Sequence, residues 1–100
     1  MGYNTNYDIE IIGAIEVQEV DLIADIIDAV GYNPFEDKCC WYEHKIVMDD
    51  ISALHPELIF KLHGEGEDSG DIWNKYFKAG KMQECRGRVV YDEFDESKLQ

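Results

Sequence analysis

Clusters of acidic side chains are the residues of this sequence whose types and spacing could do chemistry. Asp21, Asp25 and Asp28 are four and three residues apart, so on a helix their side chains form one row. A second group of acids lies among glycines between residues 64 and 71: Glu65, Glu67, Asp68 and Asp71. A carboxylate row can steer a protein toward a basic surface, and carboxylates on a loop can hold Mg²⁺ or Ca²⁺.

The acidic loop at residues 64–71 does not have the ligand spacing of a calcium-binding loop. An EF-hand loop needs oxygen ligands at alternate positions around a central glycine, and the order G-E-G-E-D-S-G-D does not supply them. We therefore predict that the glycines adopt positive φ and that the acids accept backbone hydrogen bonds. A weakly bound divalent cation, used by a metal-dependent enzyme, is the alternative. We predict no metal site and no cofactor.

The cysteines and histidines do not form a redox or zinc motif. They are Cys39, Cys40, Cys85, His44, His55 and His63, with no Cys-x-x-Cys pair and no histidine pair at helical spacing. We predict reduced, buried thiols instead of a disulfide framework. Glu43 and His44 could form an acid–base pair, but no nucleophile accompanies them. We therefore expect no catalytic residue and a protein that is not an enzyme.

The net charge of the protein limits the classes of molecule that it can bind. The 100 residues contain 22 Asp and Glu against 9 Lys and Arg, a formal charge of −13. This charge argues against direct binding to nucleic acid or to an anionic membrane. No apolar run is long enough to cross a membrane, and the polar first residues do not have the pattern of a signal peptide. We expect a cytoplasmic protein.

The negative charge is concentrated at the beginning of the chain, since residues 1–37 contain nine acids and no Lys or Arg. Like charges in a helical row cost roughly a few tenths of a kcal/mol per pair, and no basic residue close in sequence offsets them. Two interpretations stay open. The row is a polyanionic surface that imitates nucleic-acid phosphates, or it is a solvated face that keeps a small protein in solution.

Hydrophobic periodicity predicts the elements that position these groups. Residues 7–12 alternate apolar and acidic side chains, as in a strand with one buried face. Residues 18–30 have apolar side chains at helical spacing, and Gly31 ends that helix. A second helix is predicted before Pro56, at residues 44–54. Further strands are predicted at residues 38–44, 58–63, 72–77 and 82–91, with a turn at residues 78–81 and an acidic tail along the surface at residues 92–100.

Two helices and five short strands in 100 residues can pack only as two layers. We predict a single α+β domain over residues 1–100, a two-layer sandwich with both helices on one face of a four- or five-stranded, mostly antiparallel sheet. The opposite face of the sheet is then open to water or to a partner. The predicted core consists of Ile11, Ile23, Ile27, Val30, Val47, Ile51, Leu54, Phe60 and Leu62.

Aromatic and basic side chains gather in residues 72–91. We single out Trp73 and Tyr76 as partner contacts, because protein interfaces are enriched in aromatic residues and in arginine. The basic residues nearby are Lys75, Lys78, Lys81, Arg86 and Arg88. Such a surface would contact a partner protein or a second copy of the chain in a homodimer. A plain β-hairpin would have the same composition.

Four runs resemble a family of small phage and prophage proteins. They are G-Y-N-T at residues 2–5, W-Y-E-H at residues 41–44, H-P-E-L-I-F-K-L-H-G-E-G-E at residues 55–67 and G-D-I-W-N-K-Y-F-K-A-G-K at residues 70–81. The resemblance implies a variant of the ferredoxin-like α+β fold and no catalytic role. An acidic phage protein of this size is similar to inhibitors of host defence, of the anti-CRISPR and anti-restriction types, some of which imitate DNA.

The resemblance therefore implies a binding protein that inhibits a host nuclease or CRISPR effector in the cytoplasm of the host cell. Its predicted contacts are the carboxylates of Asp21, Asp25 and Asp28, those of the loop at residues 65–71, and the side chains of Trp73 and Tyr76. The alternatives from other classes are a structural or assembly protein of a mobile element and the metal-dependent enzyme.

Overall fold

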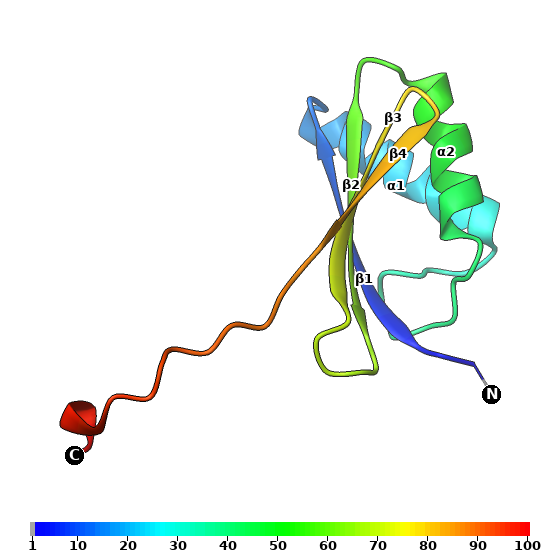
Figure 1. Ribbon diagram of the computed structural model, residues 1–100. Coiled ribbons are helices and arrows are strands. Elements are labelled where there is room, and N and C mark those ends of the chain that lie inside the picture. Colours follow the sequence, from blue (N-terminus) through cyan, green and yellow to red (C-terminus); the bar gives the residue numbers. More distant parts are fainter. Residues whose placement is uncertain (1) are drawn as a thin grey trace.

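A computed structural model describes residues 2–100, so Met1 of the predicted domain lies outside the described residues. In chain order the elements are β1 (Thr5–Ile12), α1 (Glu16–Val30), α2 (His44–Leu54), β2 (Ile59–Gly66), β3 (Ile72–Lys78), β4 (Lys81–Arg86) and a short 3₁₀ turn, η1 (Glu96–Lys98). The strands form one antiparallel sheet in the order β1-β2-β3-β4, and both helices cover the same face of it (Figure 1). The predicted α+β two-layer sandwich is confirmed.

Both helices lie in the single connection between β1 and β2, which are neighbours in the sheet. A ferredoxin-like domain instead distributes its helices as β-α-β-β-α-β. The fold is therefore a variant of that plan, in which one long helical crossover precedes a three-stranded meander. One face of the sheet consequently carries all the helical cover, and the other face carries none (Figure 1).

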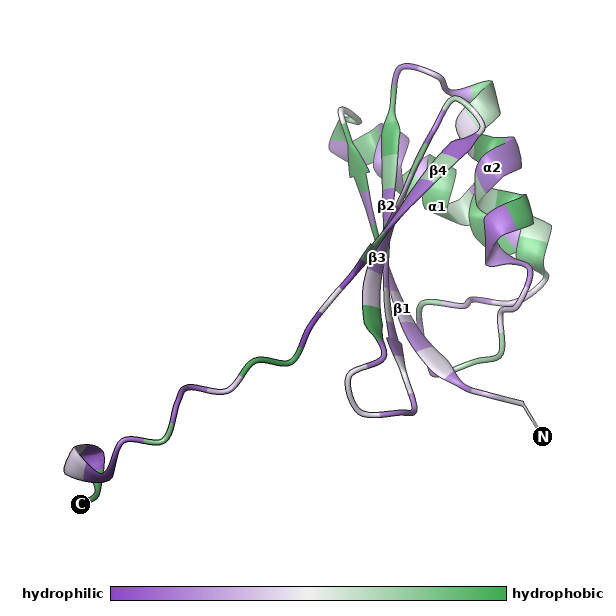
Figure 2. Ribbon diagram, in the orientation of Figure 1, coloured by the Kyte–Doolittle hydropathy of each residue, from purple (hydrophilic) through white to green (hydrophobic). Residues whose placement is uncertain are grey.

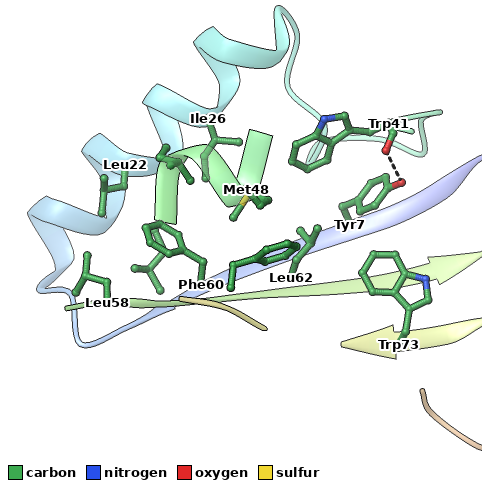
Figure 3. Close-up of a cluster of buried hydrophobic side chains, with 12 residues drawn as sticks. Tyr7, Leu22, Ile26, Trp41, Met48, Leu58, Phe60, Leu62 and Trp73 are labelled. Carbon is green, nitrogen blue, oxygen red and sulfur yellow. Dashed lines mark hydrogen bonds between the residues drawn. The ribbon is translucent and has the colours of Figure 1, made fainter. Parts of the chain in front are cut away.

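Sequence alternation explains the core. In β1, Tyr7 and Ile11 are buried while Asp8 and Glu10 point to the open face. Phe60 and Leu62 extend the buried face onto β2, and Ile26 and Met48 meet them from the helices (Figure 3). Phe77 extends the same face onto β3. The predicted burial of Ile11, Ile51, Phe60 and Leu62 is confirmed.

The predicted buried face of α1 is partly confirmed, because Ile23 and Val30 pack against the core, but neither is fully buried. Leu22 and Ile26 are its buried residues, whereas Val20 is 62% exposed and Ile27 is only partly buried. Apolar residues occupy more than one side of this helix, so the period alone does not choose among them, and contact with the sheet does. Leu54, at the end of α2, is 76% exposed instead of lying in the core.

The predicted strand at residues 38–44 does not form. The chain meets the free edge of β1 at one point, where Thr5 and Cys39 exchange backbone hydrogen bonds of 2.9 and 3.1 Å. A turn follows and places Trp41 in the core, 3% exposed. Trp41 fills the space at the end of the helical layer, whereas Tyr42 is 65% exposed. Cys39, Cys40 and Cys85 are free and only partly buried, not fully buried as predicted.

The last predicted strand is shorter than expected, because β4 ends at Arg86 and residues 87–91 lie outside the sheet. From residue 87 onward the chain leads away from the domain instead of lying over its surface (Figure 1). Within residues 2–100, no helix has the length and apolar character needed to cross a membrane.

Candidate functional site

Helix α1 presents a row of carboxylates on the side that faces away from the sheet. Asp21, Asp25 and Asp28 are all exposed, whereas Leu22 and Ile26 of the same helix are buried. The predicted exposure of the row is confirmed. Side chains at this spacing have their Cβ atoms about 5–6 Å apart, so the charges lie side by side along the helix.

Nothing close by neutralises this row. Glu16 and Glu19 in the first turn interact favourably with the positive end of the helix dipole. Asp28 lies in the last turn, at the negative end, and that turn contains no basic residue. Within the described residues 2–100, no acid of α1 takes part in an ion pair. The helix therefore tolerates both the repulsion between these carboxylates and the unfavourable contact of Asp28 with the helix dipole, and no ion pair offsets the negative field of the row.

A groove between the two helices adjoins the carboxylate row. It has a volume of about 420 Å³ and is lined by Asp25, Ala29, Val47, Asp50, Ile51, Leu54 and His55. Its walls are apolar, and its acidic rim is formed by Asp25 of α1 and Asp50 of α2. We call Asp21, Asp25, Asp28 and Asp50, together with this groove, the acidic helix surface. It suits a partner that carries an apolar side chain beside basic ones.

Sequence reasoning missed the α2 half of this surface. Val47, Ile51 and Leu54 share one helical face, which predicted that all three would be core. In the structure Ile51 is buried and Val47 packs partly buried against the core, whereas Leu54 remains on the surface as one wall of the groove. The position of Asp50 next to this apolar face was the one sign in the sequence that an acidic edge borders it.

The carboxylate of Asp71 in the predicted acidic loop is held by two donors. Tyr3 Oη donates to Asp71 Oδ2 at 2.6 Å, and Arg86 donates to Oδ1 at 2.9 Å. The Tyr3 hydrogen bond and then the Arg86 hydrogen bond lower the pKa of Asp71. Asp71 therefore ties the N-terminal segment and β4 to the loop.

The other loop acids also hold the N-terminal segment or point elsewhere. Glu67 accepts from the backbone N–H of Asn4 at 3.0 Å, and the backbone N–H of Asp68 donates to Tyr3 Oη at 3.0 Å. Glu65 faces His63, with Oε1 and Nε2 3.6 Å apart. Across residues 2–100, no three His, Cys, Asp or Glu side chains are grouped as a metal ion would require.

Two of the loop glycines are needed for a different reason from the predicted one. Of the three loop glycines, Gly64, Gly66 and Gly70, only Gly70 has a positive φ, of 85°. A methyl group on Gly64 would overlap the indole of Trp73, and one on Gly66 would overlap the Asp71 carboxylate and the Tyr3 ring. Close approach of side chains, not positive φ, therefore requires glycine at positions 64 and 66.

Trp73 and Tyr76 lie on opposite faces of β3. Trp73 is 7% exposed and belongs to the core, so its indole is not available to a partner. Tyr76 is partly exposed on the open face of the sheet, opposite Lys61 and Gln83 in the neighbouring strands. Of the two predicted aromatic contacts, only Tyr76 stands on a free surface.

His44 and Lys75 form a polar pair at the aromatic end of the core. His44 Nδ1 lies 2.8 Å from the Trp41 carbonyl oxygen, and Nε2 lies 2.7 Å from Lys75 Nζ. With Nδ1–H donating to the carbonyl and Nε2 accepting from the ammonium, the imidazole is neutral. Burial, together with the charge of Lys75, lowers the pKa of His44.

The pair also explains why Trp73 is buried. The His44 ring stacks on Trp73 with centroids 5.4 Å apart, and Lys75 Nζ lies 4.3 Å from the Trp73 ring centroid. Lys75 Nζ is 3.8 Å from Glu84 Oε1 on β4. Burial lowers the pKa of Lys75 as well. No sequence motif links residues 44 and 75, so the contact between His44 and Lys75 could not be predicted. Glu43, which was considered as an acid–base partner of His44, is not among the residues that hydrogen-bond to its ring.

The predicted contacts thus lie in three places. The carboxylate row is on the helical layer, the loop acids lie at the end of the sheet where β2 turns into β3, and Tyr76 is on the open face (Figure 1).

No protein-family model matches this chain, and comparisons with curated proteins and with solved structures likewise give no match. The function must therefore be argued from the surfaces themselves.

Proposed function

We propose that this protein works by binding, as an inhibitor of a nucleic-acid-processing host defence complex of the anti-CRISPR or anti-restriction type. The observation that carries the proposal is the uncompensated carboxylate row of Asp21, Asp25 and Asp28 beside an apolar groove. The partner is a nuclease or CRISPR effector in the cytoplasm of the host cell, and the acidic helix surface occupies the basic channel that normally receives nucleic acid.

Each part of the acidic helix surface has a separate task in this mechanism. The carboxylate row raises the rate of encounter with a basic channel, because long-range attraction steers association. The groove beside Asp25 and Asp50 supplies the short-range apolar contact that charge alone does not give. Leu54, already 76% exposed, is the side chain best placed to contact the partner without disturbing the core.

The test compares two triple variants of equal net charge. Asp21→Asn, Asp25→Asn and Asp28→Asn together should weaken capture of the partner and inhibition of its activity, while melting stays unchanged or rises slightly because repulsion is relieved. The control neutralises three exposed acids elsewhere: Glu36→Gln, Asp37→Asn and Glu96→Gln. Binding that depends only on total charge would fall equally in both variants.

A competition experiment tests whether the captured protein is a nucleic-acid enzyme. A nucleic-acid enzyme held by the acidic helix surface should be released by rising salt and by its own DNA or RNA substrate. Leu54→Ser should weaken binding with little change in stability, since Leu54 is on the surface. Full inhibition by the Asp triple variant would remove the mimicry mechanism.

A further inference from the structure

The open face of the sheet has an apolar groove near the β3–β4 hairpin, on the side that the helices do not cover. The groove has a volume of about 550 Å³ and is lined by Ile59, Tyr76, Lys78, Ala79, Lys81, Met82 and Gln83. Ile12, 41% exposed, is the strand partner of Ile59 and extends this apolar region onto β1. This groove is separate from the acidic helix surface, which lies on the helical layer.

The groove is also basic, in a protein whose formal charge is −13. Lys78 and Lys81 pair across the hairpin and are both exposed. Within residues 2–100, neither lysine takes part in an ion pair, whereas Lys61 and Lys75 each face a glutamate. An acidic segment with apolar side chains is the ligand that matches such a groove.

The C-terminal segment of this chain has that character. It is exposed along its whole length and carries large apolar side chains, Val89, Val90, Tyr91 and Phe94, interspersed with the acids Asp92, Glu93 and Asp95. Figure 2 shows these hydrophobic stretches on the segment that extends away from the domain. Val90 and Tyr91 are 82% and 85% exposed, which is unusual for adjacent large apolar residues.

We propose that residues 88–95 of one copy of the chain dock in the open-face groove of a second copy, and that the exchange is reciprocal. Apolar side chains of the segment cover Ile59 and Tyr76, and its carboxylates face Lys78 and Lys81. The interaction is distinct from the proposed inhibitory contact, because it uses the opposite layer of the fold.

Geometry favours a second copy over the chain's own groove. The segment leaves the sheet at Arg86, whereas the groove lies at the Lys81 end of β4, about 17 Å away over five residue steps. Gly87 donates its N–H to the Ile72 carbonyl at 2.8 Å, so the chain leaves in the direction of β4, away from the groove (Figure 1). A chain that reversed at once would bring only residue 92 and later residues to the groove, which would leave Val89 and Val90 uncovered.

The test uses full-length protein and sedimentation velocity over a range of concentrations. We expect a concentration-dependent dimer that weakens as salt rises. Lys78→Glu with Lys81→Glu should weaken the dimer at least about tenfold. Adding Asp92→Lys and Glu93→Lys to that variant should restore the dimer, because the charges are then exchanged across the interface.

Controls separate the alternatives. Lys38→Glu with Lys98→Glu makes the same change of net charge outside the groove and the segment, and should leave the dimer intact. A monomer whose residues 88–95 exchange amide hydrogens slowly would show docking in the chain's own groove and would overturn the proposal. A monomer with rapid exchange in this segment, or a dimer indifferent to both charge-reversal variants, would also overturn it.

Discussion

Gly64 and Trp73 are directly opposed on β2 and β3, and the indole of Trp73 lies across the backbone of Gly64. Both residues are buried, and Trp73 is held on its other side by the stacked ring of His44. The absence of a side chain on Gly64 is what admits the indole to the core. The contact joins the glycine-rich end of β2 to the aromatic end of the core.

Gly64→Ala should destabilise the fold by about 1–3 kcal/mol, because the new methyl group overlaps the Trp73 ring in a well-packed region. Equilibrium denaturation by urea measures the change in the free energy of unfolding. Gly70→Ala is the comparison: φ of 85° makes it strained, at roughly 1 kcal/mol, but without a steric overlap. A neutral Gly64→Ala would show that Trp73 packs elsewhere.

Ile26→Ala should cost about 2–5 kcal/mol, because Ile26 is fully buried between α1 and the sheet. Val20→Ala on the same helix should change stability by no more than about 0.5 kcal/mol, since Val20 is on the surface. Thermal and urea unfolding of the two variants side by side measure the difference. A larger loss of stability for Val20→Ala than for Ile26→Ala would mean that α1 packs through its other face.

His44 should make the fold less stable in mild acid. Its pKa is lowered in the folded state from an ordinary value of 6.5, so below that pH the unfolded chain takes up a proton that the folded one resists. The free energy of unfolding should therefore fall as pH drops from about 7, by at most about 1.4 kcal/mol per pH unit for this one group. Above that range His44 is neutral in both states and contributes no pH dependence.

NMR titration of the His44 ring checks this directly, and Lys75→Gln is the informative variant. Removing the ammonium that faces Nε2 should raise the pKa of His44, because one of the causes that lower it is gone. The pH dependence of stability should then shrink. A His44 ring that titrates at 6.5 or above in the unaltered protein contradicts the geometry described above.

The loop acids should act on stability without metal. Asp71→Asn and Tyr3→Phe should each lower the melting temperature. The effect of the double variant should be smaller than the sum of the two single effects, because both substitutions remove the same hydrogen bond between Tyr3 and Asp71. Chelator should leave melting unchanged in all of these proteins. Because the pKa of Asp71 is lowered in the folded state, its contribution should be present near neutral pH and lost as pH falls below about 4.

Titration with Mg²⁺, Ca²⁺ and Mn²⁺ completes the test. A rise of several degrees in the melting temperature at low millimolar metal, abolished by Glu67→Gln with Asp71→Asn, would instead make the loop a cation site. The hydrogen bonds from Asn4 and Tyr3 to these carboxylates lead us to expect no such shift.

Local periodicity was sufficient for most of the secondary structure. Alternation at residues 7–12 and helical spacing at residues 18–30 each report which side chains share a face, and that information is present in neighbouring residues. The exposure of Asp21, Asp25 and Asp28 followed from the same rule. The same rule accounts for Trp73 and Tyr76 on opposite faces of one strand, although both were predicted to contact a partner.

Only the tertiary structure decided which of those faces lies inside. Periodicity specifies the spacing of apolar residues but not their partners, so it could not choose Leu22 and Ile26 over Val20 and Ile27. The buried position of Trp41 could not be predicted either. Trp41 lies in the core without being part of a strand, and this depends on the space that the surrounding elements leave for its side chain. The pairing of His44 with Lys75, 31 residues away, likewise exists because the sheet and α2 bring them together, and no local pattern records such a distance.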